Sequence, residues 1–234
     1  MVGRIDASGN VDTTTGLTDA ADLNTPRSAT STNGTDLWFT GAAGGIHFAT
    51  LGGTTSTQLS TTLTNLRQAN IFGGQLFVTT SSGTALRLGT VGTGTPTTSG
   101  QAIVSLPGFP TSGSPYGYFF ADLDATVAGI DTVYVASDDA AALTKYSLVG
   151  GTWTANGTVG ASADAYRGVT GVATGTSVTL YATRKGGSTA TGGGELVVLV
   201  DTSGYNAAFS GTPTLLATAA ANTAFRGVAL APHL

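Results

Sequence analysis

The segment AYRGVTGVATG, residues 165–175, returns in shorter form as AFRGVALAP, residues 224–232. Both copies begin with alanine and an aromatic residue and continue with Arg-Gly-Val. A motif that recurs after several tens of residues indicates a repeated structural unit. We therefore looked for further copies along the whole chain.

Three more segments match the motif loosely: TPRSATS (residues 25–31), NLRQANI (65–71) and PYGYFFA (115–121). Successive anchor positions of the five segments are separated by 40, 50, 50 and 59 residues. The anchors are Arg27, Arg67, Gly117, Arg167 and Arg226.

Each of the first four segments is followed by a short apolar run with an aromatic residue at its centre. These runs are DLWFT (36–40), QLFVT (75–79), TVYVA (132–136) and TLYAT (179–183). A third strand pattern follows each run, for example TKYSLV, and a fourth, weaker pattern closes the unit. Asn-Gly and Gly-Gly pairs separate several of these patterns, as expected for hairpin turns that need a positive φ.

Four short strands in a repeated unit of 40–60 residues are typical of a β-propeller blade. We predict an all-β chain that forms a single β-propeller domain, residues 1–234, with the arginine segments as inner strands and the aromatic strands between neighbouring blades. The predicted complete blades span 25–62, 65–107, 115–160 and 165–220, and partial blades span 1–20 and 224–234.

The partial segments predict a fifth blade built from both ends of the chain. Phe225–Leu230 has the inner-strand pattern, GRIDASG (3–9) the third-strand pattern and NVDTTTGLT (10–18) the fourth, but nothing corresponds to the second strand. Two interpretations follow: a compact five-bladed ring with a three-stranded closing blade, or a fragment of a larger propeller whose open edges pair with a second copy. A threonine-rich β-solenoid is the other fold considered, but its coils would be shorter and more constant in length.

The composition limits the function. Charged residues are 9% of the chain, the net charge is −4 and cysteine is absent. Nucleic-acid binding needs a basic face, and disulfides or thiolate metal sites need cysteine. No apolar run is long enough to span a bilayer, so we expect no membrane insertion. The N-terminus MVGRIDASGN has no apolar core of a signal peptide, so we expect any export leader to be absent from this chain.

Several stretches resemble a family of bacterial secreted β-propeller proteins of unassigned activity, hypothetical surface proteins with "FRGVA"-type blades. These are RIDASGNVDTTT (4–15), TGTPTTSG (93–100), GSPYGYFFADLD (113–124), TKYSLVGGTW (144–153) and AFRGVALAP. The resemblance implies an extracellular or cell-surface location in bacteria. It also implies that further strands precede residue 4, and it transfers no catalytic residue or ligand.

The repeated arginines predict one candidate site. At the start of inner strands, Arg27, Arg67, Arg167 and Arg226 would surround the mouth of a central channel, with Tyr116 and Tyr118 beside Gly117. Guanidinium groups bind anions through paired hydrogen bonds. The alternative is that each arginine bonds to carbonyl groups or an aspartate of the next blade.

Aspartates predict a second candidate site. Asp122, Asp124 and Asp131 follow the third inner strand, and carboxylates in a loop can bind calcium. Their spacing lacks the pattern of known calcium loops, so solvated turn aspartates are the alternative, and we expect no other cofactor. Asp138 and Asp139 follow the next strand.

Catalytic motifs for hydrolysis, phosphate binding or zinc proteolysis are absent from the sequence. His47 is interpreted as an outward-facing strand residue, His233 is next to the C-terminal residue and Glu195 is the lone glutamate. We predict a non-catalytic extracellular interaction or structural module, with itself, a surface protein or a glycan as partner. The alternatives are a lectin-like or anion-binding propeller, in which Trp153 stacks on a sugar or the channel mouth binds an anion, and a lyase or hydrolase that uses Asp122 and Asp124.

Overall fold

A computed structural model describes residues 1–21, 24–138, 142–186 and 193–232. The chain forms two compact units. The first unit contains Met1–Leu106 together with the chain end from Ala231, and the second contains Pro107–Leu230. Among the described residues, no helix is both long and apolar enough to cross a membrane.

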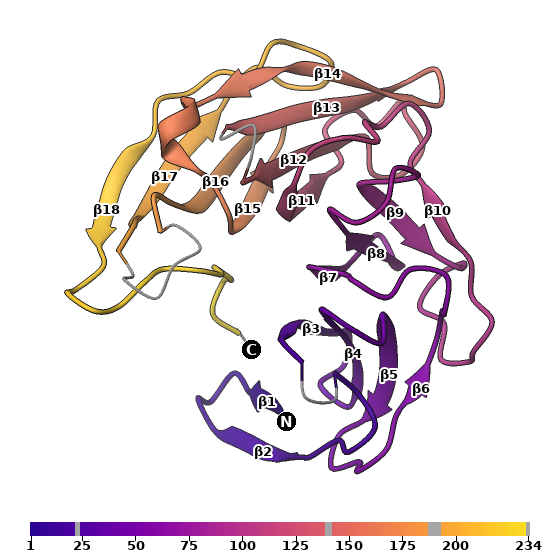
Figure 1. Cartoon of the computed structure of the whole chain (residues 1–234). Coiled ribbons are helices and arrows are strands. Elements are labelled where there is room, and N and C mark those ends of the chain that lie inside the picture. Colours follow the sequence, from indigo (N-terminus) through magenta and orange to yellow (C-terminus); the bar gives the residue numbers. More distant parts are fainter. Residues whose placement is uncertain (22–23, 139–141, 187–192, 233–234) are drawn as a thin grey trace. The chain divides into compact units, whose positions relative to one another are not determined.

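The first unit contains a two-stranded hairpin and two four-stranded antiparallel sheets (Figure 1). The hairpin joins β1 (Val2–Ile5) and β2 (Val11–Thr15). One sheet contains β3 (Pro26–Ser31), β4 (Asp36–Gly41), β5 (Ile46–Thr50) and β6 (Thr57–Gln58). The other contains β7 (Ala69–Phe72), β8 (Gln75–Thr79), β9 (Leu88–Val91) and β10 (Ile103–Ser105).

The second unit contains two more sheets of the same kind, in which consecutive strands lie side by side (Figure 1). One contains β11 (Pro115–Ala121), β12 (Thr132–Ser137), β13 (Leu143–Val149) and β14 (Thr152–Val159). A 3-10 turn, η1 (Ser162–Asp164), precedes the other. That sheet contains β15 (Val169–Thr174), β16 (Ser177–Arg184), β17 (Glu195–Asp201) and β18 (Thr214–Thr218).

The four sheets confirm the predicted fold class: the chain is all-β and is built of four-stranded β-propeller blades. Separate four-stranded sheets are not the continuous stack of a solenoid, so that alternative is wrong. The predicted fifth blade combines chain segments from both units and stays a prediction.

The second strand of each sheet lies in the core, as its aromatic pattern predicts. Trp38, Phe77 and Tyr134 are buried, whereas Tyr181 is half-buried. One apolar cluster joins the two sheets of the first unit and includes Trp38, Leu66 and Val78. A second cluster joins the two sheets of the second unit and includes Tyr134, Leu180 and Val197. Each blade therefore covers the apolar face of its neighbour within a unit.

Glycine pairs form two of the tight turns. Gly73 and Gly74 join β7 to β8 with φ of 54° and 74°, and Gly150 and Gly151 join β13 to β14 with φ of 58° and 81°. Two successive positive φ values match the twist of a hairpin, and glycine adopts them without steric strain.

The C-terminal copy of the motif differs from the prediction. Residues 225–230 form no strand, and the β-pairing seen nearby is a parallel bridge between Gly193 and Ala224. The backbone N–H of Phe225 also donates to the carbonyl of Gly193, at 3.3 Å. The predicted inner strand has no paired second strand in the described residues, and this explains why its backbone is not part of a sheet.

The same segment nevertheless packs on the second unit as β7 packs on the preceding sheet. The hydroxyl of Thr40, in β4, donates to the carbonyl of Arg67 at 2.8 Å. The hydroxyl of Thr183, in β16, donates to the carbonyl of Arg226 at 2.8 Å. Both arginines are therefore anchored by a threonine of the second strand in the preceding blade, so Arg226 occupies an inner-strand position.

Candidate functional site

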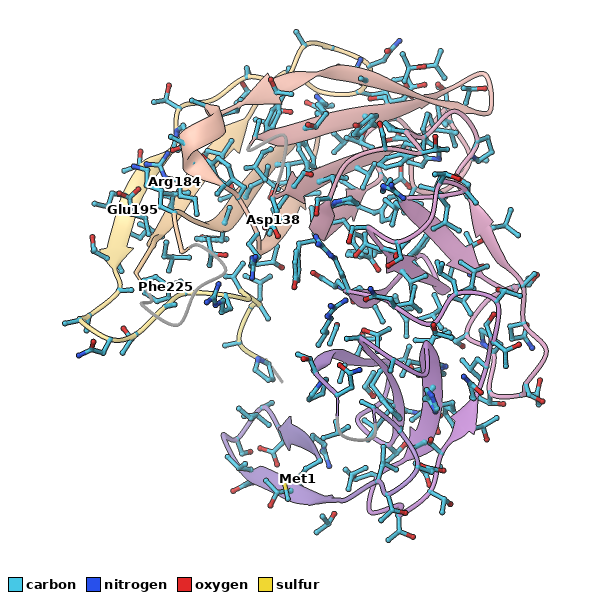
Figure 2. The ribbon with its side chains drawn as sticks, viewed as in Figure 1. Met1, Asp138, Arg184, Glu195 and Phe225 are labelled. Atoms are coloured by element: carbon cyan, nitrogen blue, oxygen red, sulfur yellow. The ribbon has the colours of Figure 1, made fainter. Side chains whose placement is uncertain are left out.

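A pocket of about 190 Å³ in the second unit is the candidate binding site. It lies where the ends of β12 and β16 meet the segment before β15 and the C-terminal segment, and Figure 2 labels Asp138, Arg184 and Phe225 around it. Its lining residues are Asp138, Ala165, Arg167, Thr183, Arg184, Gly186 and Phe225.

Local backbone geometry directs Arg167 into this pocket. Ala165 ends η1 in the left-handed conformation, with φ of 45°, and turns the chain into β15. Tyr166 is then fully buried, and the next side chain, Arg167, is half-exposed. The Arg167 N–H donates to the carbonyl of Thr183 at 3.0 Å, which fixes this segment against β16.

Arg167 is held on two sides. Its Nη2 and Nε donate to the two carboxylate oxygens of Asp138, at 2.8 and 3.2 Å. Its guanidinium also stacks over the ring of Tyr116, with 4.4 Å from Cζ to the ring centroid. A guanidinium with a paired carboxylate and an aromatic face is well oriented.

Arg184 is the second cation of the pocket wall. It forms ion pairs with Asp164 at 3.1 Å and with Glu195 at 2.8 Å, and Lys185 adds a second ion pair to Glu195 at 3.1 Å. Burial opposes ionisation of Glu195, but hydrogen bonds from Lys185 and Arg184 outweigh it and hold the pKa of Glu195 below its ordinary value of 4.5. Figure 2 shows Arg184 and Glu195 close together at the ends of β16 and β17.

The charges of this cluster balance. Arg167, Arg184 and Lys185 face three carboxylates, those of Asp138, Asp164 and Glu195. The pocket wall therefore offers donors and acceptors of hydrogen bonds together with the half-buried ring of Phe225. A ligand with both hydroxyl donors and acceptors matches this chemistry without displacing an ion pair.

The repeated arginines do not share one role. Arg27 donates from Nη1 to Asn65 Oδ1 at 2.6 Å and to the Leu66 carbonyl at 3.0 Å, which ties β3 to the segment before β7. Arg67 and Arg226 are anchored through their carbonyls, and Arg226 is half-buried. The interblade alternative therefore describes Arg27, whereas the structure brings Arg167 together with Tyr116 at a pocket.

The two predicted tyrosines separate. Tyr116 lies under the Arg167 guanidinium. Tyr118 is fully buried and packs edge-on against Phe120, with ring centroids 5.9 Å apart. Since neighbouring strand residues point to opposite faces, only one of a pair spaced by a bulged strand reaches the surface here.

The three aspartates are not arranged as a calcium site. The Asp131 carboxylate is buried and accepts hydrogen bonds from the N–H groups of Leu123 and Asp124 and from the Thr132 hydroxyl. Asp124 accepts from Thr126, whose side-chain and backbone hydrogen bonds lower the pKa of Asp124 below 3.8, and Asp122 is exposed. Among the described residues, no group of three or more His, Cys, Asp or Glu is placed to hold a metal.

Four other expectations need correction or fall outside the description. His47 is not outward-facing: its side chain is 6% exposed and it contacts Ser56 and the Gly44 carbonyl, each at 2.9 Å. Burial lowers the pKa of His47 below 6.5. Trp153 is also buried, against Phe120, and offers no exposed platform for a sugar. Asp139 and His233 lie outside the described residues.

The pocket residues that the sequence did not indicate are Thr183, Arg184 and Phe225. Arg184 and Glu195 pair across adjacent antiparallel strands, and this register is fixed by the hairpin rather than by a motif. The lone glutamate and the adjacent cations of ATRKGG were the available signals, and only a confident β16–β17 register would have joined them.

Comparisons with known proteins place the chain near one fold. No family model and no curated protein matches it. A solved structure described as YCF48 bound to D1 peptide is similar at 12% sequence identity and a TM-score of 0.45. The match covers 82% of this chain and 53% of that chain, so the present chain spans about half the length of that neighbour. The class of protein is thus defined by its own sheets, as a protein of β-propeller blades.

Proposed function

We propose that this chain is a non-catalytic interaction module of a bacterial secreted or cell-surface protein, and that it binds a hydroxyl-rich ligand, a glycan, in the pocket of the second unit. The observation that carries the proposal is the balanced wall of the pocket. Arg167 is fixed between Asp138 and Tyr116, and Arg184 between Asp164 and Glu195.

Fixed polar groups beside an aromatic ring favour binding, because a ligand need not order them first. Sugar hydroxyls donate to carboxylates and accept from guanidinium groups, and their C–H faces pack on rings such as Phe225. General acid–base chemistry receives no support from the pocket, since its carboxylates are engaged with cations that favour the ionised form.

A glycan array that contains neutral and sulfated glycans tests this proposal with the purified chain. We expect retention of neutral glycans and weaker retention by Arg167→Gln. Arg27→Gln is the matched control, because Arg27 has the same place in its repeat but bonds to the scaffold in the first unit. Binding to no glycan, or equal binding by Arg167→Gln, would contradict the proposal.

Anion binding is the second candidate, favoured by the two guanidinium groups in one wall. It predicts selective retention of the sulfated glycans on the same array, with loss as salt rises. Cleavage of any retained glycan would overturn the non-catalytic assignment.

The cell-surface location is part of the proposal and rests on the family resemblance and the low-charge, cysteine-free composition. Protease treatment of intact cells of the source bacterium tests it directly. Surface display predicts release of peptides of this chain before cytoplasmic markers appear, and release only after lysis would contradict it.

A further inference from the structure

Residues 225–230 occupy an inner-strand position that lacks a paired second strand in the described part of the chain. In each of the four sheets the first strand pairs antiparallel with the second: β3 with β4, β7 with β8, β11 with β12 and β15 with β16. The described strands include none that pairs with residues 225–230.

One side of this segment is held by the second unit. Besides the hydrogen bond from Thr183 to Arg226, a Cβ added to Gly168 would come within 3.1 Å of the Val228 nitrogen. Ser28 and Ala69 are the equivalent pair in the first unit, and there the Ser28 hydroxyl bonds to both the N–H and the carbonyl of Ala69. The segment is thus positioned like β7 before any strand pairs with it.

The other side is open. A Cβ added to Gly227 meets no atom within 4 Å, and Leu230 is 42% exposed. Gly227 and Ala229 are also exposed, whereas Val228 between them is half-buried. This alternation is that of a strand with one covered face.

The four blades define which strand would fit. In three of them the third residue after the arginine pairs with the central aromatic residue of the second strand: Thr30 with Trp38, Asn70 with Phe77 and Thr170 with Tyr181. The equivalent residue of the C-terminal segment is Ala229. An added strand would therefore place its aromatic residue opposite Ala229.

We propose that residues 225–230 accept an extended peptide segment of a partner polypeptide by antiparallel β-strand addition, and that the segment carries an aromatic residue between apolar neighbours, as DLWFT and QLFVT do. Backbone hydrogen bonds would supply affinity, and side chains on alternate positions would supply specificity. The proposal deepens the role of an interaction module, but it uses the open strand edge and not the polar wall of the pocket, so either proposal can fail while the other stands.

The probe is the chain's own second-strand sequence, a synthetic fluorescein-labelled peptide SVTLYATR (residues 177–184), titrated with the full chain and followed by fluorescence anisotropy. We expect saturable binding. A peptide with proline in place of the central tyrosine should not bind, because proline removes a backbone donor and disfavours the ladder. Absence of binding by the unmodified peptide would overturn the proposal.

Ala229→Pro is the matched change in the acceptor, with Ala208→Pro, at an exposed loop alanine, as its control. Loss of a backbone hydrogen bond and its strand geometry should weaken peptide binding about tenfold or more in Ala229→Pro, and Ala208→Pro should bind as the unmodified chain does. Equal binding by both variants would contradict the proposal.

Amide hydrogen exchange provides a measurement that needs no variant. Exchange at residues 227–230 should be fast in the free chain and should slow on addition of the peptide, with no change around Arg167 and Asp138. Protection of residues 227–230 in a dimer without peptide would assign the edge to a second copy of this chain and would overturn the proposal.

Discussion

The ammonium group of Lys145 lies 2.9 Å from the carboxylate of Asp201, and both side chains are fully buried. Lys145 is in β13 and Asp201 ends β17, so this ion pair joins the two sheets of the second unit. Tyr134 also donates to Asp201 at 2.7 Å, and Lys145 donates further to Ser203 and to the Gly204 carbonyl. The network satisfies a buried charge pair inside an otherwise apolar interface.

Lys145→Met should strongly destabilise the second unit, because it leaves the buried Asp201 carboxylate without its cation. We expect a loss of about 3–5 kcal/mol in the free energy of unfolding. Urea denaturation followed by tryptophan fluorescence measures it. The double variant Lys145→Met with Asp201→Leu should regain much of this loss, since no unpaired charge remains. A double variant no more stable than Lys145→Met would show that the charge is not the cause.

Asp201 predicts the acid sensitivity of the same interface. Burial raises its pKa, but hydrogen bonds from Ser203, Lys145 and Tyr134 outweigh this effect and lower the pKa from 3.8 to about 2. A folded-state pKa below the unfolded value adds stability above the unfolded pKa. That stability is lost as the pH falls from about 4 to about 2. The urea midpoint should therefore fall over this window, and its fall should be shallower in Asp201→Asn. Equal slopes for the two proteins would contradict the assignment.

Trp153→Ala should act on stability and not on ligand binding. Trp153 is buried against Phe120, with ring centroids 5.5 Å apart, and its N–H donates to the Pro107 carbonyl. Removal of such a side chain from a core costs about 3–5 kcal/mol. Thermal unfolding and the glycan array measure the two effects. Unchanged stability with loss of glycan binding would return Trp153 to the role of a sugar platform.

Much of the fold follows from local patterns. The aromatic centres at Trp38, Phe77 and Tyr134 place second strands in the core, because a strand between two blades is covered on both faces. The β1–β2 hairpin likewise lies within the segments expected to be third and fourth strands. The strand pattern failed at 225–230, where an inner-strand sequence lacks the partner that would make it a strand.

The site was less predictable, because its partners are distant in sequence. Lys145 lies on the buried face of β13 with Leu143 and Ser147, so the alternation gave its burial but not Asp201, which is 56 residues away. Similarly, the motif singled out Arg167, but its stack on Tyr116 depends on how β11 and β15 pack. Sequence separation hides such pairs until the sheets are in place.

The central claim is that each arginine-marked segment packs against the preceding blade and that the C-terminal copy does the same. Gly168 and Gly227 follow the arginine in the two Arg-Gly-Val copies and form a matched pair. A Cβ at Gly168 would lie 2.8 Å from the Arg226 carbonyl oxygen and 2.9 Å from Thr183 Oγ1, whereas a Cβ at Gly227 meets open space.

Thermal unfolding of Gly168→Ala and Gly227→Ala tests this claim most directly. Overpacking should make Gly168→Ala less stable by about 1–3 kcal/mol. Gly227→Ala should match the unmodified chain or exceed it slightly, since alanine reduces the entropy of the unfolded state. Equal stability of the two variants would contradict the packing of the C-terminal segment and the repeat built on it.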